Sequence, residues 1–201
     1  MLTIEWAENN PAQLIRRANL ASIGKRVPEN DTWKPSLAWC KAMVLAQDST
    51  LEWAHLIIDD DIRGDVSNQI VRATAYHPRH VCESWRPDWT NRPRPMPAEK
   101  RIYVGLWDIK ALINFSRERL CYRAMKETRE EAEAIKRYLI NSDDVLMQAV
   151  GWGLVTECVY RANCTAGKRS YHWFDSDWSD GWLSIEERYD EYNKWFVEHK
   201  T

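Results

Sequence analysis

Apolar side chains recur at helical spacing in two segments near the start of the chain. These segments, 10–22 and 36–47, each carry apolar residues three and four positions apart. Residues at that spacing share one face of a helix, so both segments are predicted to be helices with a buried side. The predicted inward residues are Leu14, Ile15 and Ala18 in the first helix, and Leu37, Cys40, Val44 and Leu45 in the second.

Two later segments have the character of strands. The run 55–61 is apolar and ends in aspartates, and 101–107 is rich in β-branched and aromatic residues. Such short runs favour strands over helices. Between them, 66–75 is predicted to be a helix, whereas the prolines of 85–98 predict an irregular connection.

The strongest helical pattern begins after Asp108, whose carboxylate is suited to cap the first turn. Apolar residues then repeat at helical spacing over about thirty positions, which predicts one long helix. They are Ile109, Leu112, Ile113, Leu120, Ala124, Ile135 and Leu139. A further helix is predicted over 142–158, and Ser184 with Glu187 forms a capping-box pattern that starts a last one.

The whole chain, 1–201, is predicted to be one α+β domain, rich in helix and with a small central sheet. Its 201 residues are enough for one substantial core, and no repeat, low-complexity tract or linker divides them.

Composition narrows the classes of partner. A net charge of -2 gives no global attraction to nucleic acid, so any anion site must be local. No apolar run approaches the roughly 20 residues of a membrane span. The first residues lack the basic and apolar regions of a signal peptide, so we expect a cytoplasmic protein without membrane or nucleic-acid partners.

The cysteine count favours reduced thiols. An odd number of cysteines without a signal peptide argues against a disulfide framework. A zinc site from Cys158, Cys164 and His172 is an alternative, but the C-x5-C spacing does not suit it and no fourth ligand is evident. We therefore expect no metal. The five cysteines are Cys40, Cys82, Cys121, Cys158 and Cys164.

The common catalytic and phosphate-binding motifs are absent from the sequence, which contains only seven glycines. Phosphate recognition would therefore depend on side chains, and arginine is suited to it because its planar fork pairs two oxygens. One arginine group is interleaved with histidine and tryptophan, and is either a solvated loop or an anion pocket with aromatic walls. It comprises Arg72, Arg79, Arg86, Arg92 and Arg94, with His77, His80, Trp85 and Trp89.

A second polar group begins the long predicted helix. Its members are Lys110, Asn114, Arg117 and Arg119. Positions 110, 114 and 117 share one face, and the positive end of the helix dipole also suits a phosphate. Together the two groups indicate a nucleotide site.

The segment 108–129 resembles the C-terminal segment of flavin-dependent thymidylate synthases, which reads roughly N-x-R-x-L-x-N-F-x-x-L-R-x-x-x-x-A-Q-W-E-I-R. The positions that match without a gap are Leu112, Asn114, Phe115, Arg119, Ala124, Glu127 and Arg129. Met96-Pro97 is similar to the Leu-Pro that the family has shortly upstream, before a strand.

The likeness continues upstream and covers about half of the chain. Gln69-Ile-Val-Arg72 resembles the family's Q-x-x-R, and Ser84-Trp-Arg86 resembles its S-x-R, with Glu83 near the family's acidic position. Ser49 and Thr50 stand where the family has an H-E-T-P-F-E-H-like turn before a strand. The likeness is weak before residue 45 and ends near residue 165, which leaves a divergent tail.

The resemblance implies two sets of site residues. The nucleotide would be held by Gln69, Arg72, Glu83, Ser84, Arg86, Arg119 and either Arg92 or Arg94. The flavin would be held by Ser49, Thr50, Asp108, Lys110 and Asn114, with Arg72 close to both.

The family's activity is what the resemblance implies for this chain. Such enzymes transfer a methylene group from methylene-tetrahydrofolate to C5 of dUMP and reduce it with hydride from FAD, which NADPH reduces again. They need no cysteine nucleophile and form their sites between the subunits of a homotetramer. The chain is accordingly expected to methylate a pyrimidine deoxynucleotide, dUMP by default and dCMP as an alternative.

The chain also departs from the family pattern. Ala73 and Thr74 replace a His-Arg pair that contacts the flavin, and Met125 and Lys126 replace the Gln and Trp of A-Q-W-E. A nucleotide-binding protein of the same fold that has lost flavin and catalysis is therefore a second hypothesis.

Overall fold

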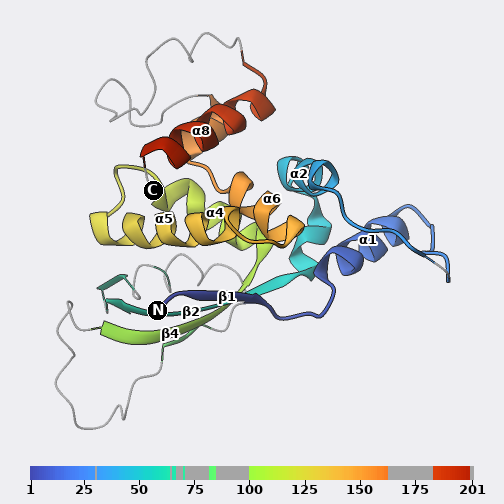
Figure 1. Ribbon diagram of the computed structural model, residues 1–201, viewed down its shortest axis with the longest axis horizontal. Coiled ribbons are helices and arrows are strands. Elements are labelled where there is room, and N and C mark those ends of the chain that lie inside the picture. The colour runs from blue at the N-terminus through green and yellow to red at the C-terminus, as the bar shows by residue number, and fades with distance from the viewer. Residues whose placement is uncertain are drawn as a thin grey trace.

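A computed structural model describes residues 1–29, 31–63, 65–66, 70, 82–84, 100–162 and 183–199. Within them, helices pack against a small antiparallel sheet, which confirms the helix-rich α+β class (Figure 1). No described helix is both long enough and apolar enough to cross a membrane.

The sheet has the strand order β1-β2-β4-β3. Its strands are β1 Thr3–Trp6, β2 His55–Arg63, β3 Cys82–Ser84 and β4 Lys100–Asp108. The predicted strands 55–61 and 101–107 are confirmed as β2 and β4, which pair from His55 opposite Asp108 to Arg63 opposite Lys100. The hydrophobic pattern did not predict β1, because a strand of four residues places too few side chains on its inner face to show an alternation.

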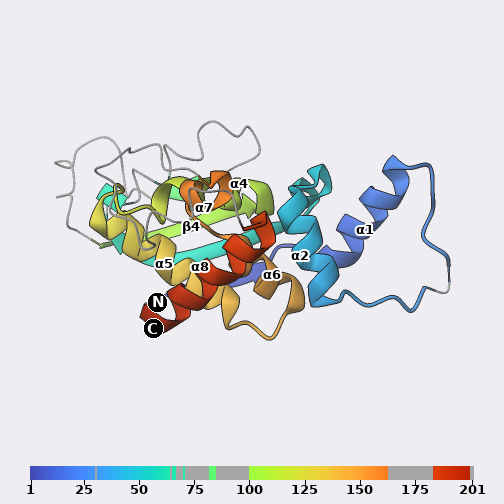
Figure 2. The same cartoon turned by 90° about the horizontal axis from the view of Figure 1, so that it is seen from above.

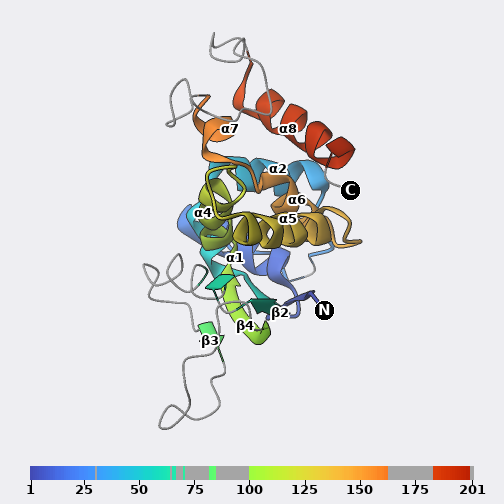
Figure 3. The ribbon, with the colours of Figure 1, turned by 90° about the vertical axis from the view of Figure 1, so that its left-hand side faces the viewer.

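One face of the sheet is buried under helices. Along β2, Leu56, Ile58 and Ile62 are buried while Asp59 and Asp61 are exposed, as the two-residue period of a strand requires. Figures 1 and 3 show α4 and α5 on one side of the sheet, with α6 beside them and α8 farther out.

The two predicted N-terminal helices are confirmed as α1 (Pro11–Ser22) and α2 (Leu37–Ala46). Each begins with a polar cap: Asn10 accepts the N–H of Gln13 at 3.3 Å, and the Ser36 hydroxyl accepts that of Trp39 at 3.2 Å. The prediction that Leu37 faces inward is wrong, since this residue is 39% exposed. It is the first residue of α2, and the buried side chains of this helix, Cys40 and Val44, begin one turn later.

The long predicted helix is wrong: the structure divides it into α4 (Ile109–Arg119) and α5 (Lys126–Ile140). A continuous helix of about thirty residues would measure ~45 Å, longer than a small domain is wide. The turn after Arg119 instead returns the chain, so that Leu112 and Leu139 enter the same core. Apolar residues keep their helical spacing across this turn, so the spacing alone did not reveal that the helix is interrupted.

The predicted helix 142–158 is likewise divided, into α6 (Val145–Gly153) and α7 (Glu157–Arg161). Leu154 is extended, with φ −76° and ψ 97°, and Leu154 and Val155 are buried in the connection. Gly153 lets α6 approach α2, because a Cβ there would lie 2.1 Å from Cγ1 of Val44. The close approach of the two helices, together with burial of the connecting residues, accounts for the break.

The last helix, α8 (Ile185–His199), confirms the capping box. The Ser184 N–H donates to Glu187 at 2.7 Å, and the Glu187 N–H donates to the Ser184 hydroxyl at 3.3 Å. A second core cluster joins α8 to α6 and α7; its buried members are Trp152, Val155, Val159, Tyr189, Tyr192 and Phe196.

Polar side chains add to this attachment. Fully buried Lys136 of α5 donates to the carbonyl of Gly151 at 2.8 Å and to Asn193 of α8 at 2.6 Å. Burial lowers the pKa of Lys136 well below its usual value. Arg188 of α8 donates to the carbonyls of Val159 and Tyr160 at the end of α7. The open carbonyls of α6 and α7 thus receive donors from the neighbouring helices.

Of the predicted helix 66–75, Val66 and Ile70 are helical and buried. The rest of that segment and the irregular connection 85–98 lie outside the described residues.

A carboxyl pair between α5 and the sheet predicts a pH dependence of stability. Burial and the neighbouring Asp60 raise the pKa of Glu131 from 4.5 to about 7. Between these values the folded protein retains a proton that the unfolded chain releases, so the free energy of unfolding should fall as pH rises from 5 to 7.5. One pKa unit corresponds to about 1.4 kcal/mol, which sets an upper bound of about 3 kcal/mol.

The variant Glu131→Gln should lose most of this slope while keeping its fold. Chemical denaturation at several pH values would measure it. The exposed Glu130→Gln is the matched control, and an unchanged slope in Glu131→Gln would contradict the assignment to this pair.

Candidate functional site

The residues expected at a cofactor and nucleotide site divide into three groups. Gln69, Arg72, Arg86, Arg92 and Arg94 lie outside the described residues. Glu83 and Ser84 lie on β3, opposite Val104 and Tyr103 of β4. The remaining six are described: Ser49, Thr50, Asp108, Lys110, Asn114 and Arg119.

Ser49 and Thr50 lie on a short 3-10 helix, η1 (Ser49–Trp53), which meets α4. Lys110 and Asn114 lie on α4, and Asp108 caps it. We call this meeting point the η1–α4 junction. The backbone N–H of Ile109 donates to the carbonyl of Ala54 at 3.3 Å, and Nζ of Lys110 lies 3.1 Å from Oε1 of Glu52. The turn and the helix head, far apart in sequence, are thus adjacent in the fold.

Two members of the junction have structural partners. Buried Thr50 donates both its N–H and its hydroxyl to Oδ1 of Asp48, at 2.8 and 2.6 Å. Buried Asp108 accepts the N–H of Ala111 at 2.7 Å, which confirms it as the cap of α4. Both side chains stabilise the backbone of the junction.

The other three members are exposed or partly exposed. Ser49 is exposed, Asn114 is partly exposed, and the Lys110 side chain is 31% exposed. A hydroxyl, a carboxamide paired with Arg117 and an ammonium paired with Glu52 are therefore at least partly accessible here. These groups suit a polar ligand with hydrogen-bonding and anionic parts.

The expected face of α4 extends from the junction to Arg117. Nη1 of Arg117 donates to Oδ1 of Asn114 at 3.4 Å, and the guanidinium lies 3.7 Å from the centre of the Tyr160 ring. Nε of Arg117 is 3.9 Å from a carboxylate oxygen of Glu157. Tyr160 and Glu157 come from α7, and no spacing in the sequence marked them as neighbours of Arg117. This arrangement joins α4 to α7.

Arg119 differs from Arg117 in its partners. Its side chain is 21% exposed, and its ion pair with Glu118, at 3.6 Å, joins it to the adjacent and largely exposed residue. Its Nε is buried and has no hydrogen-bond partner among the described residues. A buried guanidinium N–H without an acceptor is costly, so Arg119 retains donor capacity suited to an anion.

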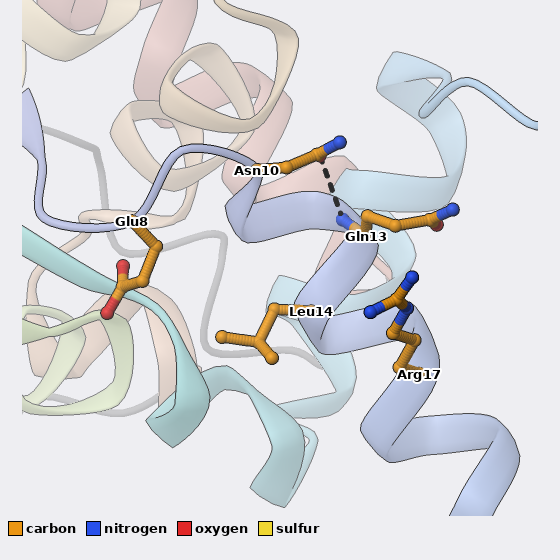
Figure 4. A pocket seen from close by; sticks show the side chains of 5 residues that line it. All are labelled: Glu8, Asn10, Gln13, Leu14 and Arg17. Atoms are coloured by element: carbon orange, nitrogen blue, oxygen red, sulfur yellow. Dashed lines mark hydrogen bonds between the residues drawn. The ribbon is translucent and has the colours of Figure 1, made fainter.

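A hollow of about 260 Å³ lies elsewhere, along α1, and contains none of the expected site residues (Figure 4). It is lined by Glu8, Asn10, Gln13, Leu14 and Arg17. Both carboxylate oxygens of Glu8 are occupied by His55, which donates its backbone N–H at 2.9 Å and approaches with Nδ1 at 2.7 Å. The hollow is small for a ligand site and has one cation, Arg17, at its edge.

The residues of the alternative zinc site do not form a described cluster. Cys158 contacts the Thr156 hydroxyl at 3.1 Å, whereas Cys164 and His172 lie outside the described residues. Among the side chains that the structure describes, no three histidine, cysteine or acidic groups gather to hold a metal ion.

The described site is therefore a polar junction at the head of α4 and, in the last turn of that helix, Arg119, whose buried Nε has no hydrogen-bond partner among the described residues. In Figure 2, α7 lies next to α4. Comparison of the sequence with protein-family models and with curated proteins found no match in either set.

Proposed function

We propose that this protein is a flavin- and folate-dependent enzyme that methylates C5 of a pyrimidine deoxynucleoside monophosphate. The substrate is dUMP by default, with dCMP as the alternative, and NADPH supplies the reducing equivalents. The fold would then be that of the flavin-dependent thymidylate synthases, with sites shared between the subunits of a homotetramer.

The observation that carries the proposal is the η1–α4 junction. The resemblance implied that Ser49 and the residues at the head of α4 hold one cofactor, although more than fifty positions separate them. The contacts of Ile109 with Ala54 and of Lys110 with Glu52 bring these segments together. This proximity is a requirement of the proposal and is independent of the sequence motif.

The junction suits a flavin dinucleotide in its chemistry. Ser49, Lys110 and Asn114 would hold it through hydrogen bonds and one positive charge, while Thr50 and Asp108 keep the backbone in place. The bound flavin would supply hydride transfer, and the protein supplies orientation and charge. Arg119 would donate its unused N–H to a phosphate of the nucleotide.

A second candidate is a nucleotide-binding protein without flavin. It is favoured by the partners of Thr50 and Asp108, two expected cofactor ligands that are buried and already hydrogen-bonded within the protein. In that case Arg119 would still bind an anion, and the junction would be structural.

Purified protein distinguishes the two candidates. The enzyme should bind FAD, absorb in the flavin region and bleach when NADPH is added without oxygen. It should also be stabilised against heat by dUMP or dCMP, because a ligand that binds only the folded state raises the melting temperature. A protein that takes up no flavin but is stabilised by a nucleotide would support the second candidate, and failure of both ligands would refute both.

A further inference from the structure

Trp53, the last residue of η1, is an exposed tryptophan on a well-anchored backbone. Its side chain is 55% exposed, although tryptophan carries a large apolar surface that normally packs. Among the described residues its ring stacks on no other ring and its indole N–H has no hydrogen-bond partner. Neither the core nor a polar contact accounts for its position.

The backbone on both sides of Trp53 is held in place. Asp48 caps the start of η1, and the carbonyl of Ala54 accepts the N–H of Ile109 at 3.3 Å. The next residue, His55, donates its N–H to Glu8 at 2.9 Å and begins β2. The indole therefore projects from a fixed support, and a ligand that packs on it would lose little backbone entropy in the protein.

The surroundings of Trp53 specify what would pack on it. The preceding residue, Glu52, pairs with Lys110 at 3.1 Å, and that lysine is 31% exposed. An exposed indole one residue from the Glu52–Lys110 pair suits a planar ring system that carries hydrogen-bond acceptors or negative charge. An aliphatic or a cationic partner would not use both groups.

We propose that Trp53 is a stacking platform for the isoalloxazine ring of the flavin at the η1–α4 junction. This inference rests on the proposed function, because it requires that the junction binds flavin. It adds a residue that the motif resemblance did not include. Trp53 would hold the ring by its face, and Lys110 would supply positive charge next to it. The role is one of binding and positioning.

The test compares Trp53→Ala, Trp53→Phe and the unmodified protein by titration with FAD, using calorimetry and the quenching of flavin fluorescence. Loss of a stacked aromatic should weaken flavin binding by about 5- to 100-fold in Trp53→Ala, by analogy with stacking of bases on aromatic residues. Trp53→Phe should retain most of the affinity. Tyr138→Ala, which removes a 38% exposed aromatic from α5, is the matched control and should bind like the unmodified protein.

The outcomes separate this inference from the proposed function. If the unmodified protein binds flavin and Trp53→Ala binds it equally well, the stacking role is overturned and the proposed function stands. If the unmodified protein binds no flavin, both are overturned. A second copy of the chain is the other possible cover for Trp53. An altered oligomeric state in Trp53→Ala without a change in flavin affinity, measured by light scattering, would also overturn the stacking role.

Discussion

Replacing Arg119 with alanine should reduce nucleotide affinity by about 10- to 100-fold. A hydrogen bond to a charged group contributes about 1.5 to 3 kcal/mol, and each 1.4 kcal/mol changes affinity tenfold. The expectation rests on Nε of Arg119, which is buried and has no acceptor among the described residues. The guanidinium is otherwise paired with the exposed Glu118. Calorimetric titration with dUMP and with dCMP would measure the effect.

The control for this variant is Arg26→Ala, which removes an equal charge from an exposed loop. It should bind both nucleotides like the unmodified protein, because a distant exposed charge is screened by salt. If Arg119→Ala folds normally and retains full affinity, the last turn of α4 does not belong to the nucleotide site.

Replacing Gly151 with alanine should destabilise the protein by about 3 kcal/mol or more, since overpacking of a core typically costs 1 to 3 kcal/mol and more where backbone must move. A Cβ at this position would lie 2.6 Å from the backbone nitrogen of Ile140 and 2.9 Å from the carbonyl carbon of Leu139. The two helices α5 and α6 would have to separate, and the Gly151 carbonyl would leave Lys136. Urea denaturation would measure the loss.

Gly24→Ala is the control for the added methyl group. A Cβ there meets nothing within 4 Å, and the cost is limited to a positive φ of 72°. That conformation costs a residue with a Cβ about 1 kcal/mol. Equal losses in the two variants would show that the close approach of α5 and α6 does not limit stability.

Arg117 and Arg119 show that a sequence motif can suggest site residues without predicting their tertiary contacts. Both were expected at the head of a helix that binds an anion, and they are two positions apart. Nε of each guanidinium is buried without a hydrogen-bond partner among the described residues. Arg117 also stacks on Tyr160 and lies near Glu157, both from α7. The ion pair of Arg119 is instead with its sequence neighbour, Glu118. Adjacent charges with similar prospects in the sequence thus acquire different roles, because helix α7 packs on one of them.

Local sequence patterns were sufficient to predict the α+β class, the main strands, and several helix starts. These features depend on local patterns: the apolar run of β2, the helical spacing of apolar residues in α1 and α2, the cap Asp108, and the Ser184–Glu187 box. A cap acts on residues two or three positions away, so its effect is readable without knowledge of the rest of the fold.

The ends of several helices, and the contacts between residues far apart in the chain, depend on the packing of the whole fold. The turn between α4 and α5 and the extended Leu154 between α6 and α7 interrupt continuous apolar patterns. The η1–α4 junction and the burial of Lys136 depend on contacts between segments far apart in the chain. Such contacts are selected by packing of the whole core, where one arrangement fills space and satisfies buried polar groups, and no local window of sequence contains that information.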